Sequence, residues 1–160
     1  MDAHQHDLFL GLPARGPAPA RPEPSLEAQA REVLVVGVDD WAIADAAAHL
    51  SAAGRKVHRC SESAEAPFPC NALVPGRGCP LDRRAIDVVL DVHSSARPGL
   101  RLSEMGAVCG LRSGLPLVVA GISDGSVLAP WAHEIPVGGE IVPNCDEAVR
   151  RSQRAKGGRN

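Results

Sequence analysis

Uninterrupted apolar runs recur along the middle of the chain. They occupy residues 31–40, 85–92 and 115–122, and each is bounded by charged residues, glycine or proline. Runs of this kind, unlike alternating ones, are typical of strands buried on both faces inside a parallel sheet. We therefore predict three central strands, a short strand at residues 56–60 and an edge strand at residues 139–143.

Helical spacing of apolar residues appears between these runs. Ile43, Ala46 and Leu50 recur at intervals of three and four, and a glycine four residues later acts as a helix stop. Further helices are predicted over residues 102–112 and 145–153. Strands and helices thus alternate along the chain, which is the order of units that build a parallel sheet with right-handed crossovers.

One crossover departs from this order. Residues 61–84 contain four prolines and two glycines, so a long helix is disfavoured there. The fold predicted is a three-layer α/β domain over residues 31–151, with a doubly wound parallel sheet of four to five strands of the flavodoxin-like type. Residues 1–30 are expected to form a disordered extension with a proline-rich linker, and residues 152–160 a basic tail.

The net charge and the low aromatic content argue against some classes of binding partner. A net charge of −2 and 2% aromatic residues disfavour a dedicated nucleic-acid binder, which needs a basic surface and stacking platforms. No run approaches about 18 apolar residues and the N-terminus lacks the positive charge of a signal peptide, so we predict a cytoplasmic protein without membrane attachment. A protein partner or a homodimer is expected, and a small ligand is a further candidate.

Polar residues follow the predicted strands. Asp39 and Asp40 end the first long run, Asp91 and His93 the second, and Ser123 follows the third. In doubly wound sheets, ligands bind outside the carboxyl ends of the strands. We therefore expect Asp39, Asp40, Asp91 and Ser123 to form a ligand or cation pocket, with Mg²⁺ as the candidate ion. The alternative is that each aspartate only terminates a strand.

Residues 33–57 resemble the opening of a response-regulator receiver domain, and Asp39 and Asp40 match the acidic pair that holds magnesium in that family. Residues 87–99 are similar to the phosphoacceptor strand and loop of the same family, with Asp91 at the acceptor position. The resemblance covers roughly residues 32–149. It implies a receiver-like fold and a role in signalling.

The chain departs from the receiver pattern at the residues that handle phosphate. Gly121 and Val142 stand where the family has a Ser or Thr and a Lys, and neither side chain can bind a phosphoryl oxygen. The expected function is therefore a non-catalytic regulatory or sensor module that has lost phosphotransfer. It would sense an ion, a small ligand or a redox state.

Residues 103–121 also resemble the glutamate-bearing helix and following strand of nucleoside 2-deoxyribosyltransferases, on the match of Glu104 and Gly106. This resemblance implies an enzyme acting on an N-glycosidic bond, with Glu104 as nucleophile and Asp91 orienting the sugar. The alternative is that Glu104 lies near a helix N-terminus because the helix dipole favours a carboxylate there.

Cysteines form a third candidate site. Cys60, Cys70 and Cys79 lie in or beside the segment rich in proline and glycine, without a Cys-x-x-Cys pair. Together with Cys109 or a histidine, they could bind zinc or an iron–sulfur centre. A redox disulfide between Cys70 and Cys79 is a second interpretation, and buried apolar thiols a third.

Overall fold

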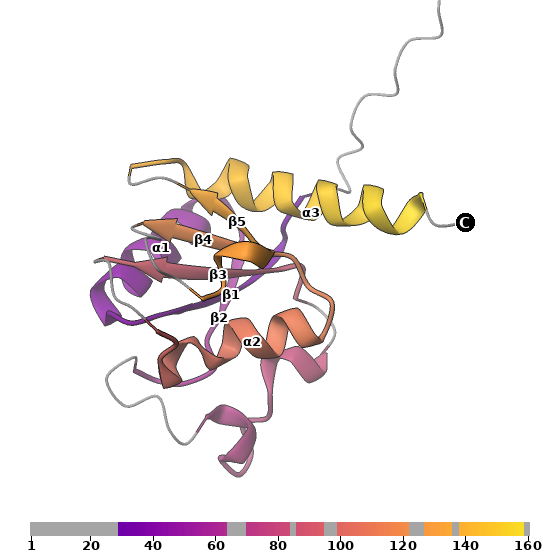
Figure 1. Cartoon of the computed structure of the whole chain (residues 1–160). Helices are drawn as coiled ribbons and strands as arrows, with labels where there is room; N and C mark the ends of the chain where they lie inside the picture. The colour runs from indigo at the N-terminus through magenta and orange to yellow at the C-terminus, as the bar shows by residue number, and fades with distance from the viewer. Residues whose placement is uncertain are drawn as a thin grey trace, which may run out of the picture.

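Five parallel strands form one sheet in the order β2-β1-β3-β4-β5 in a computed structural model (Figure 1). The strands are β1 Glu32–Gly37, β2 Lys56–His58, β3 Val88–His93, β4 Leu117–Gly121 and β5 Ala132–Ile135. This order is that of flavodoxin-like doubly wound folds, so the predicted fold class is confirmed. The structure describes residues 29–63, 70–83, 86–94, 99–121, 127–135 and 138–158.

Helices cover both faces of the sheet, which gives the three predicted layers (Figure 1). Helices α1 (Asp40–Ala52) and α3 (Ile141–Gly157) lie on one face, and α2 (Met105–Arg112) lies on the other. Short 3-10 turns occupy Asn71–Leu73, Pro80–Arg83 and Leu102–Glu104. None of the described helices is both long and apolar enough to cross a bilayer.

The alternation of side chains along the strands divides the core in two. On β3, Val88, Leu90 and Val92 pack towards α1 and α3, whereas Val89 packs towards α2. Helix α2 comes unusually close to the sheet at two glycines. A Cβ on Gly110 would lie 2.3 Å from Val89 Cγ2, and one on Gly106 would lie 2.6 Å from Val36 Cγ1. These positions therefore accept no side chain without displacing the helix.

The structure differs from the sequence prediction at the C-terminal end. The fifth strand is Ala132–Ile135, and residues 141–143, expected in a strand, begin α3. Their apolar side chains continue into a stripe of helical period on α3, formed by Ile141, Cys145, Ala148 and Val149. Proline at position 143 is compatible with this because the first turn of a helix has no intrahelical partner for its N–H groups.

Two further segments bear on the predicted boundaries. Residues 152–157, expected in a basic tail, continue α3 as far as Gly157. Between β2 and β3, residues 70–83 form two 3-10 turns in place of a crossover helix, in agreement with the proline content. The predicted N-terminal extension, apart from residues 29 and 30, lies outside the described residues.

Candidate functional site

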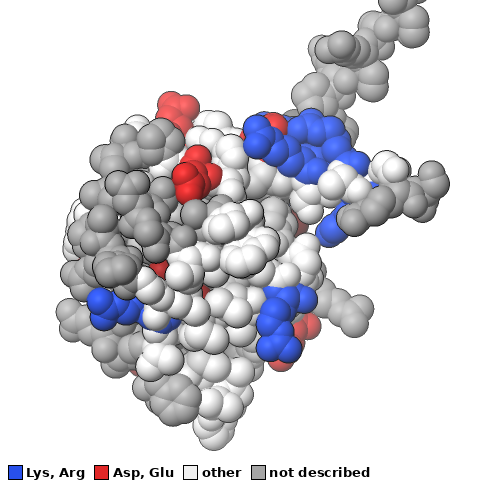
Figure 2. Space-filling model, viewed as in Figure 1, with Lys and Arg blue, Asp and Glu red and all other residues white. Residues whose placement is uncertain are grey.

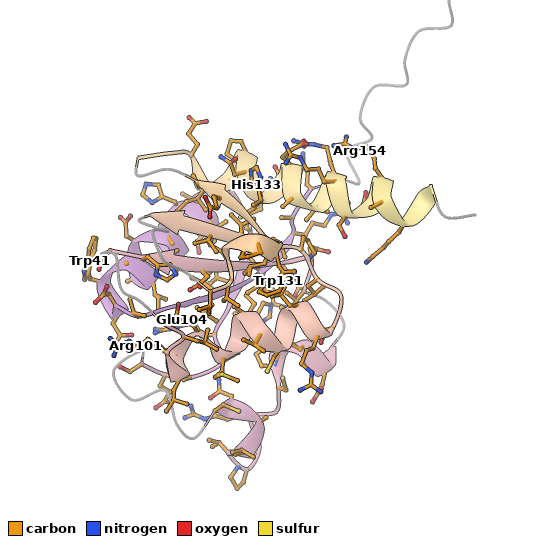
Figure 3. All side chains as sticks on the ribbon, in the orientation of Figure 1. Trp41, Arg101, Glu104, Trp131, His133 and Arg154 are labelled. Atoms are coloured by element: carbon orange, nitrogen blue, oxygen red, sulfur yellow. The ribbon has the colours of Figure 1, made fainter. Side chains whose placement is uncertain are left out.

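Three buried polar side chains meet between the sheet and the start of α2. Asp91 and His93 are two residues apart on β3, so both point to the α2 face. Glu104, which is labelled in Figure 3, ends the 3-10 turn that leads into α2. His93 Nε2 lies 3.1 Å from Asp91 Oδ2 and 3.4 Å from Glu104 Oε1. The exposed fractions of Asp91, His93 and Glu104 are 0%, 9% and 3%. We call these three residues the buried triad.

Each member of the buried triad is held by its local structure. The backbone N–H of Arg101 donates a hydrogen bond of 2.6 Å to Glu104 Oε2, which fixes the carboxylate at the start of the turn. The hydrogen bond to Asp91 raises the pKa of His93, against the lowering effect of burial. Burial raises the pKa of Glu104, and the negative charge of Asp91 raises it further. His93 therefore holds its proton more tightly here than a free imidazole does.

One oxygen of the buried triad has no hydrogen-bond partner in the described structure. Asp91 Oδ1 is buried and unpaired, although buried carboxylate oxygens are expensive to leave unsatisfied. One ligand atom from each triad residue lies within 4.8 Å of the others. An imidazole nitrogen with two carboxylate oxygens is a donor set suited to divalent transition metals.

Asp39 and Asp40, which the sequence predicts in one pocket with Asp91, have hydrogen-bond partners of their own. Asp39 accepts a hydrogen bond from the hydroxyl of Ser94, and Asp40 accepts one of 2.7 Å from Arg59 Nη2. Ser63 also donates to Asp40. Each of these aspartates therefore has a neighbour other than Asp91.

The register of the sheet shows where Asp39 lies along the strands relative to Asp91. Val36 of β1 pairs with Asp91 of β3, so Asp39 lies three residues beyond the level of Asp91. The strand runs on to His93, and the residue that lies next to Asp39 is Ser94. Ser123 falls outside the described residues.

A cavity opens at the carboxyl ends of β3 and β4, where doubly wound folds bind ligands. It has a volume of about 800 Å³ and lies between α1 and the first turn of α3. Trp41, which is 67% exposed, stands at its rim (Figure 3). Its other lining residues include His49, Ser94 and Ile141. The sequence predicted a pocket at this edge of the sheet but not its walls, which come from segments far apart in the chain.

Basic side chains gather over the C-terminal half of α3 (Figure 2). Arg150, Arg151 and Arg154 all lie within 3.0 Å of a carboxylate oxygen of Glu147. Their hydrogen bonds lower the pKa of Glu147 to about 2. The three arginines share this one carboxylate, so the surface keeps a net positive charge.

The cysteines expected at a metal or redox site lie on the α2 side of the sheet. Cys60 packs into the core cluster on that face, and Cys70 and Cys79 flank the 3-10 turns that follow it. All five cysteines are free thiols.

Glu104, the predicted nucleophile of the transferase resemblance, is buried and bonded to backbone. A nucleophile must reach the anomeric carbon of a substrate. The position of Glu104 therefore does not favour that role.

Comparison with known proteins finds similarity to solved structures. No family model and no curated protein matches it. Among solved structures, a response-regulator receiver domain protein from Clostridium thermocellum is 14% identical, with a TM-score of 0.46, covering 79% of this chain and 96% of that chain. The receiver domain of nitrogen regulatory protein C is 21% identical, with a TM-score of 0.39 and coverage of 84% and 98%.

A third similar structure is described as a transiently phosphorylated "switch" in bacterial signal transduction. It is 19% identical, with a TM-score of 0.39 and coverage of 80% and 98%. These comparisons lend no support to the nucleoside transferase resemblance. The strand order by itself gives the chain the flavodoxin-like architecture.

Proposed function

We propose that the chain is a receiver-like regulatory module that works without phosphotransfer to Asp91. The observation that carries the proposal is the burial of this carboxylate, which is 0% exposed and bonded to His93. A phosphoryl acceptor must approach the phosphorus in line with the leaving group, so its oxygen needs access to the donor. Gly121, at the end of β4, also offers no hydroxyl to a phosphoryl oxygen.

The proposal predicts that small phosphodonors leave Asp91 unmodified. Protein incubated with acetyl phosphate and Mg²⁺ should retain its unmodified mass by intact-protein mass spectrometry, and Asp91→Asn should behave identically. A phosphoryl adduct on the wild-type protein that is absent from Asp91→Asn would contradict the proposal. Ser94→Ala is the control substitution, because it changes a residue next to Asp39 at the edge of the sheet and leaves Asp91 in place.

For the sensed signal, we infer a divalent transition metal ion at the buried triad. Asp39 and Asp40 already have hydrogen-bond partners, whereas Asp91 Oδ1 has none in the described structure. Mg²⁺ prefers oxygen ligands and retained waters, so a dry site with one imidazole favours Mn²⁺, Co²⁺ or Zn²⁺ instead. A cation would also offset the negative charge of the two buried carboxyl groups.

Titration with Mn²⁺, Co²⁺ and Zn²⁺ by calorimetry tests this inference. We expect saturable binding that weakens at least tenfold in Asp91→Asn, since even residues behind the ligands change metal affinity by about 10–100-fold. Asp45→Asn is the control, because its side chain is 61% exposed on α1. Asp39→Asn should also bind normally, in contrast to the pocket predicted from sequence.

Two results would exclude the triad as the cation site. One is an unchanged binding curve in Asp91→Asn, and the other is a loss of affinity in Asp39→Asn alone. Thermal unfolding without added ion should accompany each titration, so that a loss of binding is separated from a loss of folded protein.

A further inference from the structure

Helix α2 brings two cysteines that are distant in sequence to one place. A Cβ on Gly106 would lie 2.8 Å from Cys60 Sγ, so the thiol of Cys60 packs directly against this helix. Cys109 follows Gly106 by three residues, which puts it on the same side of α2, one turn further along. Cys60 and Cys109 therefore occupy the same side of the interface between α2 and the segment after β2.

The segment after β2 brings two more cysteines to the same region. The backbone N–H of Asn71 donates to the Cys60 carbonyl at 2.7 Å, and the Asn71 side chain donates to the Arg59 carbonyl at 3.1 Å. These bonds hold Cys70, the preceding residue, beside Cys60. Leu81 packs against the core cluster on the α2 side, which Cys60 also contacts. Cys79, two residues before Leu81, is therefore brought towards the same face.

The electrostatics of Cys60 agree with this placement. Burial, together with the charges of Cys79, Cys109 and Cys70, raises its pKa to about 12. A thiol with a raised pKa is a poor redox nucleophile, because the thiolate is the reactive species. Coordination to a metal ion, in contrast, deprotonates a thiol outright.

We propose that the fold assembles a thiolate-ligated metal centre from four cysteines on the α2 side of the sheet: Cys60, Cys70, Cys79 and Cys109. Four cysteines are the ligand set both of iron–sulfur clusters and of structural zinc sites. The centre shares no ligand with the buried triad, and it does not depend on the function proposed above.

The four thiols do not form a ready-made tetrahedral site in the described structure. Among the described residues, which include all five cysteines, the buried triad is the group of three or more ligand atoms that lie mutually within 4.8 Å. Tetrahedral zinc, with bonds of about 2.3 Å, would hold its sulfur atoms about 3.8 Å apart. Binding of one zinc ion would therefore require the four side chains to move closer together.

A metal centre would also give the segment between β2 and β3 a structural anchor. This segment has no α-helix among its described residues and packs on the sheet through few apolar side chains. Metal–thiolate bonds to α2 would supply part of the stabilisation that a crossover helix normally provides, since metal binding in small sites contributes directly to folding.

The test is metal and sulfide analysis of the full chain purified without oxygen and reconstituted, in separate samples, with ferrous iron plus sulfide and with Zn²⁺. A cluster gives about four iron and four sulfide per chain with broad visible absorption, whereas a zinc site gives one zinc and no colour. Whichever centre forms, Cys109→Ala and Cys70→Ala should each bind severalfold less metal than the wild-type protein.

Matched variants show which side chains hold the metal. Cys145→Ala should keep its metal, because Cys145 is buried on the opposite face among α1 and α3. Asp91→Asn should also keep the cysteine-bound metal, which distinguishes this centre from the buried triad. Cys109 is exposed, so its alanine variant should remain folded and interpretable. Equal metal content in Cys109→Ala and wild type, no metal uptake, or a Cys70–Cys79 disulfide in the anaerobic protein would each overturn the proposal.

Discussion

Replacing Gly121 by alanine is expected to lower the free energy of unfolding by about 3 kcal/mol or more, the size of a severe backbone conflict. Gly121 ends β4 with φ of +103°, a conformation that side chains rarely adopt, and a Cβ there would lie 2.0 Å from the carbonyl oxygen of His93. His93 and Gly121 are register partners, so neither backbone can retreat without breaking the sheet. Urea denaturation followed by circular dichroism measures the loss.

Gly157→Ala is the matched control for this prediction. Gly157 is the last residue of α3, its φ is not positive and a Cβ would meet nothing within 4 Å. Alanine should therefore stabilise the helix by up to about 1 kcal/mol. If Gly121→Ala unfolded at the same urea concentration as wild type, the close approach of β3 and β4 at this position would be wrong.

Asp146→Ala is expected to cost about 3–5 kcal/mol, the range measured when one partner of a buried ion pair is removed. Asp146 Oδ2 lies 2.9 Å from Arg55 Nη2, with both side chains nearly buried at 13% and 12% exposure. Its other oxygen accepts the backbone N–H of Ala30 at 2.8 Å. Removal would leave the guanidinium charge of Arg55, whose Nε already lacks a partner in the described structure, without compensation.

The surface pair of Lys56 and Glu32 provides the comparison. Lys56 is 65% exposed and its Nζ lies 3.4 Å from Glu32 Oε1, so Lys56→Ala should cost no more than about 1 kcal/mol. The double variant Arg55→Met with Asp146→Leu should recover part of the loss, because it removes both buried charges. If Asp146→Ala and Lys56→Ala lost the same free energy of unfolding in urea denaturation, the burial of the pair of Arg55 and Asp146 would be wrong.

The sheet could be predicted from sequence because its central strands are buried on both faces. Such strands, like Val88–His93, need apolar residues at consecutive positions, and few other elements of this length do. The start of α3 could not be predicted in the same way. Ile141 and Val142 beside Glu140 also suit an edge strand, and only the packed structure shows that Ile141 continues the helical stripe.

The candidate sites could be predicted only in part from the sequence. Asp91 looked like the end of a strand because a charged residue rarely lies inside one, yet β3 continues through His93. The spacing of Asp91 and His93 already implied a shared face, but the approach of Glu104 depends on where α2 begins. For the cysteines, the contact of Cys60 with Gly106 joins two segments that no local pattern connects.

The short edge strands limit how two copies of this protein can associate. The sheet is bounded by β2, with three residues, and by β5, with four, so within the described structure a strand from another molecule finds little backbone to pair with. Short edge strands are one means by which proteins avoid edge-to-edge aggregation. Self-association of this chain, where it occurs, should therefore use helix surfaces, and the module should remain soluble at concentrations at which long open edges would aggregate.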